Sequence, residues 1–250
     1  MIAYISPAMG FNDVEVPPMQ MPKYSQEVIQ LVSEIQTYNP SQLSKLMGCS
    51  MDLAETTFAR YQNFSQNNPT IPALLAFDGI AYRSLDAASL DNESLDYLAD
   101  RLRILSGLYG YLKPFDGIHP YRLEMKTKLA GKGYKNLYEF WSDKIYQAMK
   151  SDSDGCIINL ASKEYSKCIE KYLEDQLYIT CSFKQEKQGK YRVQATRAKQ
   201  ARGAFIRYMA EHKITEPQKL KGFHELGYEY REDLSLETGL KQEFVFIARS

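Results

Sequence analysis

The sequence has few of the residues that build disulfide scaffolds and metal centres. Its 250 residues include four cysteines and three histidines, with neither a Cys-x-x-Cys pair nor the histidine spacing of a metal site. A stapled secreted fold is therefore excluded. We expect no metal and no other cofactor, and we expect reduced, buried cysteines, with a redox-sensing thiol as the alternative.

Long apolar runs are also missing. No window approaches the roughly 20 uncharged apolar residues that a membrane span requires, and residues 1–7 lack the basic start and apolar run of a signal peptide. We therefore expect a cytoplasmic protein with no membrane partner. Gly-x-Gly-x-x-Gly, Walker-type and Gly-x-Ser-x-Gly motifs are absent as well, so no motif identifies a nucleophile or a general base.

The chain has no internal repeat, no low-complexity tract and no linker rich in proline, glycine or serine. Its 44% hydrophobic and 25% charged residues are typical of a globular protein. Strand and helix patterns alternate, but several strands are joined by turns too short for a parallel crossover. We predict an α+β fold, with residues 1–250 forming a single compact domain. Helices would flank its mixed β-sheet, with a small helix-hairpin-helix element at about residues 40–62.

Hydrophobic periodicity places the individual elements. Strands are expected at 2–5, 156–160, 177–183, 190–196, 227–231 and 243–248. Longer helices are expected at 24–37, 90–105, 136–149 and 197–212. A β-hairpin is expected at 74–82, with Asp78-Gly79 as its two-residue turn.

The formal net charge of zero hides an uneven distribution. Residues 1–100 hold 4 Lys and Arg against 12 Asp and Glu, whereas residues 101–250 hold 27 against 19. Within 184–207 there are eight cationic residues and a single acid, Glu186. A neutral protein with this pattern can present an anion-binding face.

The first candidate DNA-binding element is the segment 40–62. It predicts two short helices around a glycine turn, with Ser50 capping the second helix. The turn resembles the helix-hairpin-helix of DNA repair proteins, whose successive amides hold a backbone phosphate, although the second glycine of that pattern is missing. The open alternative is that both helices only add apolar side chains to the core. The candidate DNA contacts are Lys45, Met47, Gly48, Cys49 and Ser50.

The second candidate is the basic run. Dense positive charge attracts a polyanion by counterion release, and backbone contacts of this kind carry no sequence information. Double-stranded DNA, held with weak sequence preference, is the predicted partner. The open alternative is that these cations pair with the acidic first hundred residues. The candidate contacts are Lys190, Arg192, Arg197, Lys199, Arg202 and Arg207.

The third candidate is a structured loop at 101–125, rich in glycine, proline and tyrosine. It supports an alternative function, an enzyme acting on a nucleotide or nucleic acid. In that enzyme Arg103, Arg122 and Lys199 would bind phosphate, and Ser6, Asp116 or Glu124 would transfer a proton. In the open alternative, Arg122 and Glu124 only satisfy buried backbone groups and each other. The pocket candidates are Ser6, Arg103, Ser106, Asp116, Arg122, Glu124, Asn159 and Ser162.

Six motifs in order carry a family resemblance. They are ISPA at 5–8, LRILSGLYG at 102–110, PYRLEM at 120–125, FW at 140–141, INLAS at 158–162 and Ala-Arg-Gly at 201–203. Together they make the chain similar to the YaaA family of bacterial peroxide stress proteins. The resemblance implies a cytosolic protein with a mixed α/β fold, a helix-hairpin-helix element and a positively charged cleft. It also implies binding of double-stranded DNA, linked to limiting iron-dependent oxidative damage.

The chain departs from the family pattern at two places. The family's opening usually continues with a lysine where this chain has Met9, so no role of that lysine is carried over. Asp78 and Ile80 also break the family's usual charge pattern around Gly79. With these departures noted, a DNA-binding protein of the peroxide response is our leading prediction.

Overall fold

The structure is a computed structural model that describes residues 1–65 and 70–249. Within them the main sheet has eight strands in the order β11-β12-β9-β8-β1-β5-β6, with β10 paired to β9 outside this path. The strands are β1 (Ile2–Ile5), β5 (Leu102–Ser106), β6 (Gly110–Leu112), β8 (Cys156–Asn159), β9 (Leu177–Lys187), β10 (Lys190–Arg192), β11 (Tyr228–Tyr230) and β12 (Lys241–Arg249).

The sheet is mixed, as predicted. Strands β5, β1, β8, β9 and β12 run parallel to one another. Strands β6, β10 and β11 pair antiparallel with β5, β9 and β12, respectively. The α+β class is therefore confirmed.

The central strand is β1, which pairs with β5 on one side and β8 on the other. All of Ile2–Ile5 is buried, and a strand covered on both faces reads as a continuous apolar run. The same reading identified β8, whose last three residues are buried. These two strands are far apart in the sequence but pair side by side, with Ala3 in register with Ile158.

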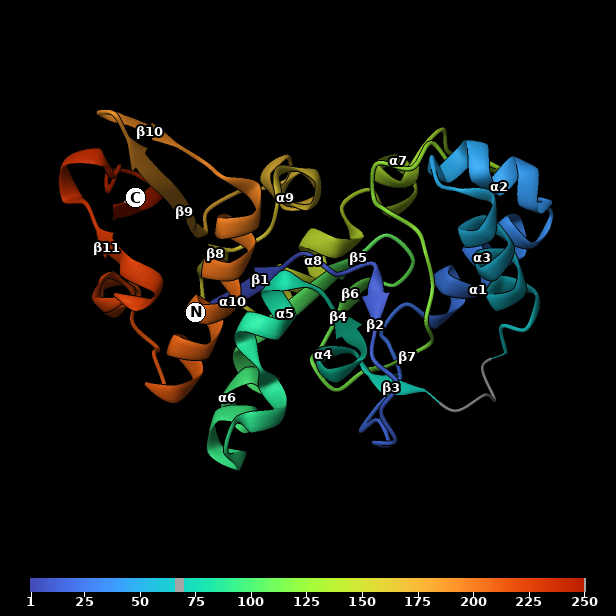
Figure 1. Cartoon of the computed structure of the whole chain (residues 1–250), viewed down its shortest axis with the longest axis horizontal. Coiled ribbons are helices and arrows are strands. Elements are labelled where there is room, and N and C mark those ends of the chain that lie inside the picture. The colour runs from blue at the N-terminus through green and yellow to red at the C-terminus, as the bar shows by residue number, and fades with distance from the viewer. Residues whose placement is uncertain (66–69, 250) are drawn as a thin grey trace.

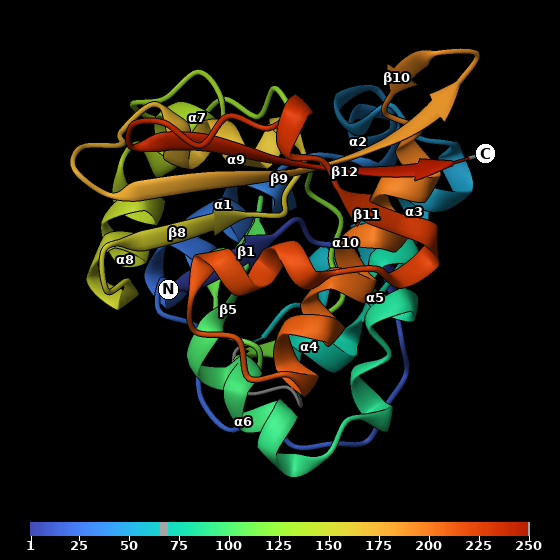
Figure 2. The ribbon, with the colours of Figure 1, turned by 90° about the vertical axis from the view of Figure 1, so that its left-hand side faces the viewer.

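Helices surround the sheet (Figures 1 and 2). Helix α10 packs against α5, α6 and β9, and α8 packs against α9. Helices α1, α2 and α3 lie together at one end of the longest axis (Figure 1). The helices are α1 (Ser25–Gln36), α2 (Pro40–Met47), α3 (Met51–Gln62), α4 (Ala73–Ala76), α5 (Ile80–Leu85), α6 (Asn92–Arg101), α7 (Leu137–Trp141), α8 (Lys144–Asp152), α9 (Lys163–Glu170) and α10 (Ala195–Glu211).

Short elements complete the chain. Four 3-10 helices cover Ala87–Ser89, Pro217–Gly222, Glu225–Gly227 and Glu232–Leu234. Two small ribbons pair β2 (Gly10–Phe11) with β4 (Phe77–Asp78), and β3 (Ile71–Pro72) with β7 (Gly117–Ile118).

The predicted hairpin at 74–82 is wrong. Phe77 and Asp78 pair with Phe11 and Gly10, not with the residues that follow them. Gly79 has an extended backbone (φ −178°, ψ 169°) and begins α5, so it does not adopt the positive φ of a hairpin turn. A strand partner from a distant part of the chain decided this segment.

Two predicted helices are also divided. The helix predicted at 90–105 ends at Arg101, and Leu102–Ser106 becomes β5, where Leu102 is in register with Ala3 of β1. The helix predicted at 136–149 is broken at Ser142 (φ 45°), which separates α7 from α8. The apolar spacing of these segments is compatible with one long helix. It is equally compatible with a helix followed by a buried strand, or with two helices in different directions.

The order of the strands creates a crevice. The chain leaves β1 towards β5 on one side, whereas it leaves β8 towards β9 on the other side. The connections therefore diverge at the carboxyl ends of β1 and β8. Crevices of this kind are where open parallel sheets bind ligands.

Candidate functional site

A cavity of about 360 Å³ opens beyond the carboxyl ends of β1 and β8. Besides the residues that follow these strands, it takes residues from α5, α9, α10 and the loop that contains Glu124. Its lining consists of Ile5, Ser6, Pro7, Ala8, Met9, Asp78, Gly79, Ile80, Ala81, Tyr82, Glu124, Leu160, Ser162, Glu164, Tyr165, Lys199 and Arg202.

Two serines join the strand ends that form the cavity. The backbone N–H of Ser162 donates to Oγ of Ser6 at 2.8 Å, and the two hydroxyl oxygens are 3.3 Å apart. Tyr82 fixes the same corner by donating its hydroxyl to the Ser6 carbonyl oxygen at 3.0 Å. The two contacts between Ser6 and Ser162 tie the segment after β1 to the segment after β8.

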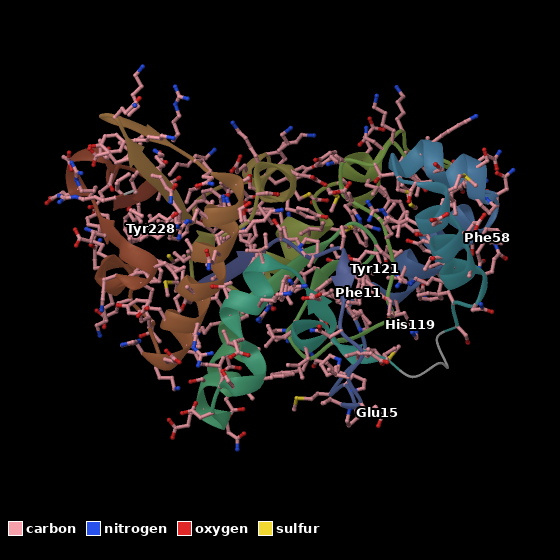
Figure 3. The ribbon with its side chains drawn as sticks, viewed as in Figure 1. Phe11, Glu15, Phe58, His119, Tyr121 and Tyr228 are labelled. Carbon is pink, nitrogen blue, oxygen red and sulfur yellow. The ribbon has the colours of Figure 1, made fainter. Side chains whose placement is uncertain are left out.

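An aromatic cluster supports the wall behind Tyr82. Phe77 lies 5.3 Å from the ring of Tyr82 and 6.3 Å from that of Tyr121, between ring centroids. Phe11 packs edge-on against Tyr121 at 5.5 Å (Figure 3). Because Tyr121 is three residues before Glu124, this packing fixes the loop that carries Glu124 into the cavity.

Two cations from α10 line the cavity. Lys199 is exposed and Arg202 is half-buried, and neither makes a hydrogen bond or salt bridge with any described residue. Burial lowers the pKa of the Arg202 guanidinium, and its Nε is completely buried without a partner. An unpaired buried donor on a cation is costly, so this part of the cavity favours an anion.

A buried phenol stands beside these cations. Tyr165 is 4% exposed, and its hydroxyl is also buried without a hydrogen-bond partner among the described residues. Burial raises the pKa of Tyr165 well above its ordinary value, so the phenol stays protonated at neutral pH. Its O–H is a donor for which no described residue provides an acceptor.

Two carboxylates line another part of the cavity. Nζ of Lys126 lies 3.5 Å from the Glu124 carboxylate and 3.9 Å from that of Glu164. The Lys126 backbone N–H also donates to Glu164 at 3.1 Å. The lysine holds the two acids together, and their remaining oxygens can accept hydrogen bonds from a ligand.

The structure gathers only part of the predicted pocket. Of the pocket candidates, Ser6, Glu124 and Ser162 line the cavity, joined by Lys199 and Arg202 from the DNA-binding candidates. If Ser6, Ser106, Arg122 and Asn159 shared one pocket, this would favour the enzyme alternative, but only Ser6 of these four lines the cavity. Sequence reasoning missed Tyr82, Glu164 and Tyr165. Glu164 and Tyr165 directly follow the INLAS motif at 158–162. This position after a recognised motif was the one sequence signal that could have identified them as site residues.

Ser106, Asn159 and Arg122 have structural contacts instead. The Ser106 hydroxyl lies 2.6 Å from that of Tyr121 and accepts two backbone N–H groups. Asn159 accepts the N–H of Ala161 at 2.9 Å, and the Arg122 carbonyl accepts the Tyr61 hydroxyl. These bonds shape the loops around the sheet.

Arg103 lies in a buried ionic network. It is 4% exposed and lies 2.8 Å from Asp152, to which Tyr111 donates its hydroxyl at 2.6 Å. Arg103 also donates to the carbonyls of Ala99 and Leu102. The arginine thus ties β5 to α6 and to the end of α8, and has no donor directed to the cavity.

Asp116 lines a separate cavity of about 300 Å³ together with Gln20, Lys113 and Asp152. Gln20 donates to its carboxylate at 2.7 Å, and the Lys113 N–H donates at 2.9 Å. Burial nevertheless raises the pKa of Asp116 from 3.8 to about 6. The folded protein therefore holds this proton more tightly than the unfolded chain does.

The pH dependence of stability should reveal this proton. A raised carboxyl pKa in the folded state makes unfolding easier as the pH rises from about 4 to about 6. We expect Asp116→Asn to remove this loss, so that its stability relative to the wild type rises by about 2–3 kcal/mol between pH 4 and pH 7. Urea unfolding of both proteins across this range measures the difference. Asp96→Asn, an exposed change on α6, is the control, and a flat difference for Asp116→Asn would contradict the expectation.

The basic run divides into paired and unpaired residues. Arg207 is clamped by Glu211 at 2.8 Å, by Asp86 and by the carbonyls of Leu85 and Asp86. Lys184 pairs with Glu243 at 3.3 Å. Arg207 thus follows the alternative of pairing with the acidic first hundred residues and joins α10 to α5, whereas Lys190, Arg192, Arg197 and Lys199 are exposed.

The segment 40–62 forms the two predicted helices. Asn39 and Gln42 form a capping box at the start of α2, Gly48 ends α2 with φ 60°, and Ser50 caps α3. The N–H groups of Gly48 and Cys49 both donate to the Ser44 carbonyl. Met47 is buried, whereas Lys45, Gly48 and Ser50 are exposed and Cys49 is half-buried. Two amides of the turn are therefore used internally and are not directed outward.

Comparison with known proteins now places the chain. The family model described as peroxide stress protein YaaA matches residues 1–234. The chain is 42% identical over 222 residues to a UPF0246 protein of Agathobacter rectalis, covering 88% of this chain and 89% of the relative. The chain belongs to the peroxide stress protein YaaA family. It is also 44% identical over 226 residues to a UPF0246 protein of Limosilactobacillus fermentum, with 90% of each chain covered.

Four of the motifs that carried the YaaA resemblance meet at the cavity. Residues 5–8 line it directly, 120–125 supply Glu124, 158–162 supply Leu160 and Ser162, and 201–203 supply Arg202. The departures from the family pattern, Met9 and the residues around Gly79, line it too. The cavity is therefore the part of this YaaA-family chain where its recognisable motifs converge.

Three of the four cysteines have thiols whose pKa is raised by burial. Burial raises the pKa of Cys156 to about 11 and that of Cys168 to about 12, and the pKa of the Cys181 thiol is shifted further upward for the same reason. Each of these thiols is protonated at neutral pH and is a poor nucleophile.

Metal ligands and bilayer-spanning helices are both missing from residues 1–65 and 70–249. In this part of the YaaA-family chain, no three or more His, Cys, Asp and Glu side chains are placed to hold a metal ion together. None of its helices combines the length and apolar character that crossing a bilayer requires.

Proposed function

We propose that this YaaA-family protein acts in the peroxide stress response by binding duplex DNA through its sugar–phosphate backbone. The observation that carries the proposal is the segment 190–202, named here the basic segment. It contains five cations and no acid, and none of the five pairs with a carboxylate among the described residues. Unpaired cations of this density bind a polyanion by releasing its counterions. The cations are Lys190, Arg192, Arg197, Lys199 and Arg202.

The arrangement of the elements suits an extended ligand. The β9–β10 hairpin, which carries the start of the basic segment, projects from the body at one end of the longest axis (Figures 1 and 2). Helix α2 lies at the other end of this axis on the same upper side as β10 in Figure 1, with α3 below it. A duplex lying along this side would contact β10 and the start of α10 first, and the turn between α2 and α3 second.

The turn between α2 and α3 makes the smaller contribution. The N–H groups of Met51 and Asp52, in the first turn of α3, remain available to a phosphate together with the exposed Lys45. Asp52 opposes this contact by its charge. The proposal therefore depends on the basic segment, and it places the protein in the cytoplasm, in contact with the chromosome.

A salt titration with matched variants tests the proposal. The affinity for a labelled duplex of arbitrary sequence should fall linearly with salt on logarithmic axes. We expect the triple variant K190A/R192A/R197A to bind duplexes more weakly than the wild type does, by about the same factor for duplexes of unrelated sequence. The slope of the logarithm of its binding constant against the logarithm of the salt concentration should be smaller in magnitude by about 0.9 for each phosphate that the variant no longer neutralises. Fluorescence anisotropy between low and physiological salt gives both quantities.

The control removes the same charge from other surfaces. Lys144, Lys150 and Lys219 each pair with a glutamate away from the basic segment, so K144A/K150A/K219A should leave the slope unchanged. Equal slopes for all three proteins, or no salt-sensitive binding by folded wild-type protein, would refute the proposal. The variant K45E tests the contact at the turn between α2 and α3. We expect it to lose less duplex affinity than the triple variant does.

A further inference from the structure

We propose that the cavity at the carboxyl ends of β1 and β8 binds one nucleotide unit, meaning a phosphate group with its attached nucleoside. This inference goes beyond the proposed function, because Lys190, Arg192 and Arg197 of the basic segment do not line the cavity, and only Lys199 and Arg202 belong to both. A duplex is too wide for a space of about 360 Å³, but a single nucleotide is of suitable size.

The phosphate part follows from donors that have no partner. Four buried side-chain polar atoms among the described residues lack a hydrogen bond, and two of them, Nε of Arg202 and the hydroxyl of Tyr165, belong to residues that line this cavity. A guanidinium and a phenol are both donors, and a guanidinium matches two phosphate oxygens at once. Lys199 adds a second positive charge at the same place. A phosphate would neutralise the two cations that line the cavity, Arg202 and Lys199.

The nucleoside part follows from the remaining walls. Ile5, Pro7, Met9, Ile80 and Leu160 give the cavity an apolar lining, which a bare phosphate does not need and which suits the faces of a base.

The two carboxylates indicate that the ligand also carries hydrogen-bond donors. Glu124 and Glu164 can only accept hydrogen bonds when ionised, and they would repel a ligand that consisted of phosphate alone. Lys126 holds both acids in place from one side. Sugar hydroxyls and base N–H groups provide the donors that these oxygens require, while the phosphate lies against Arg202.

The cavity is connected to the basic segment through α10. Lys199 and Arg202 are three residues apart on this helix and therefore lie on one face, with Lys199 exposed and Arg202 half-buried. The row of charge thus continues from the surface into the cavity. The nucleotide could be free in solution, or it could be an unpaired nucleotide of a bound DNA molecule.

Binding to the full chain tests the first part. The probes are the four nucleoside 5′-monophosphates, the corresponding nucleosides, ribose 5-phosphate and inorganic phosphate, measured by calorimetry at fixed salt. We expect at least one monophosphate to bind tenfold or more tightly than its nucleoside, ribose 5-phosphate and inorganic phosphate. Equal binding of ribose 5-phosphate or inorganic phosphate, or no binding of any monophosphate, would overturn the inference.

Arg202→Met is the decisive variant. We expect it to weaken monophosphate binding at least tenfold while the melting temperature without ligand stays equal or rises, because the change removes a buried charge without a partner. Lys167→Ala, an exposed change on α9 outside the cavity, should alter neither quantity. Unchanged monophosphate binding by folded Arg202→Met would overturn the inference.

A comparison of duplexes identifies the source of the nucleotide and separates this inference from the proposed function. If the nucleotide comes from DNA, a duplex with one unpaired nucleotide will bind more tightly than a fully paired duplex, and Arg202→Met will abolish only that advantage. If it is a free metabolite, the two duplexes will bind alike while the monophosphate still binds. Loss of paired-duplex binding in K190A/R192A/R197A with intact monophosphate binding supports two separate sites, and loss of both ligands together would contradict them.

Discussion

Replacing Arg103 by alanine is expected to lower the free energy of unfolding by about 3 kcal/mol. Arg103 is nearly completely buried and is the charged partner of Asp152. Hydrogen bonds from Tyr111 and Arg103 outweigh the effect of burial and lower the pKa of Asp152, so the variant leaves this partly buried carboxylate without its charged partner. Two backbone carbonyls would also lose their donor. Urea or guanidinium unfolding at pH 7 measures the loss.

Arg83→Ala is the matched control for this expectation. Arg83 also pairs with an aspartate, Asp78, through two hydrogen bonds, but its side chain is 71% exposed. Exposed pairs are screened by water and add little to stability, so this variant should unfold close to the wild type. If both arginine variants lowered the free energy of unfolding equally, burial of the Arg103–Asp152 pair would not contribute to stability, which would contradict the expectation.

Gly203→Ala is expected to destabilise the protein by about 2–3 kcal/mol, although alanine is the better helix former. A Cβ at position 203 would lie 1.9 Å from the Ala81 carbonyl oxygen and 3.0 Å from the Leu85 backbone nitrogen. Because α5 and α10 cross at this point, the clash meets backbone and cannot be relieved by turning a side chain. Helix α5 must therefore move.

Two measurements check this expectation. Thermal or urea unfolding gives the loss of stability, with Thr196→Ala at the exposed start of α10 as a control that should change little. Since Ile80, Ala81 and Tyr82 of α5 line the cavity, binding of the nucleoside monophosphates should weaken together with the stability. Wild-type stability for Gly203→Ala would mean that the two helices are not in backbone contact.

Local signals in the sequence were enough for much of the fold. The capping pattern around Pro40, Gly48 and Ser50 predicted α2 and α3, because caps and breakers act within a few residues. The apolar runs of β1 and β8 also predicted their strands correctly. The alternation at the β9–β10 hairpin did so only in part, because the strand predicted at 190–196 ends at Arg192 and α10 begins at Ala195. The predicted mixed sheet followed from connections too short for parallel crossovers.

The elements predicted wrongly depended on partners far along the chain. Residues 102–106 are apolar enough for a helix or a strand, and they became β5 because β1, about a hundred residues earlier, offered an edge to pair with. The Asp78-Gly79 turn failed for the same reason, since Phe77 and Asp78 found Phe11 and Gly10. Periodicity carries no information about such pairings.

By itself the sequence determined the family, the α+β class and the presence of a dense cluster of cations before and within α10. Only the tertiary structure decided which of these cations remain unpaired. It paired Arg207 with Glu211 and Asp86, left β10 and the start of α10 exposed, and turned Arg202 into the cavity. The site itself was likewise undetermined, because it joins residues near positions 6, 80, 124, 162 and 202. Neighbouring residues in the sequence determine local features such as helix caps and clusters of charge. The order of the strands in the sheet determines which distant side chains line the same crevice.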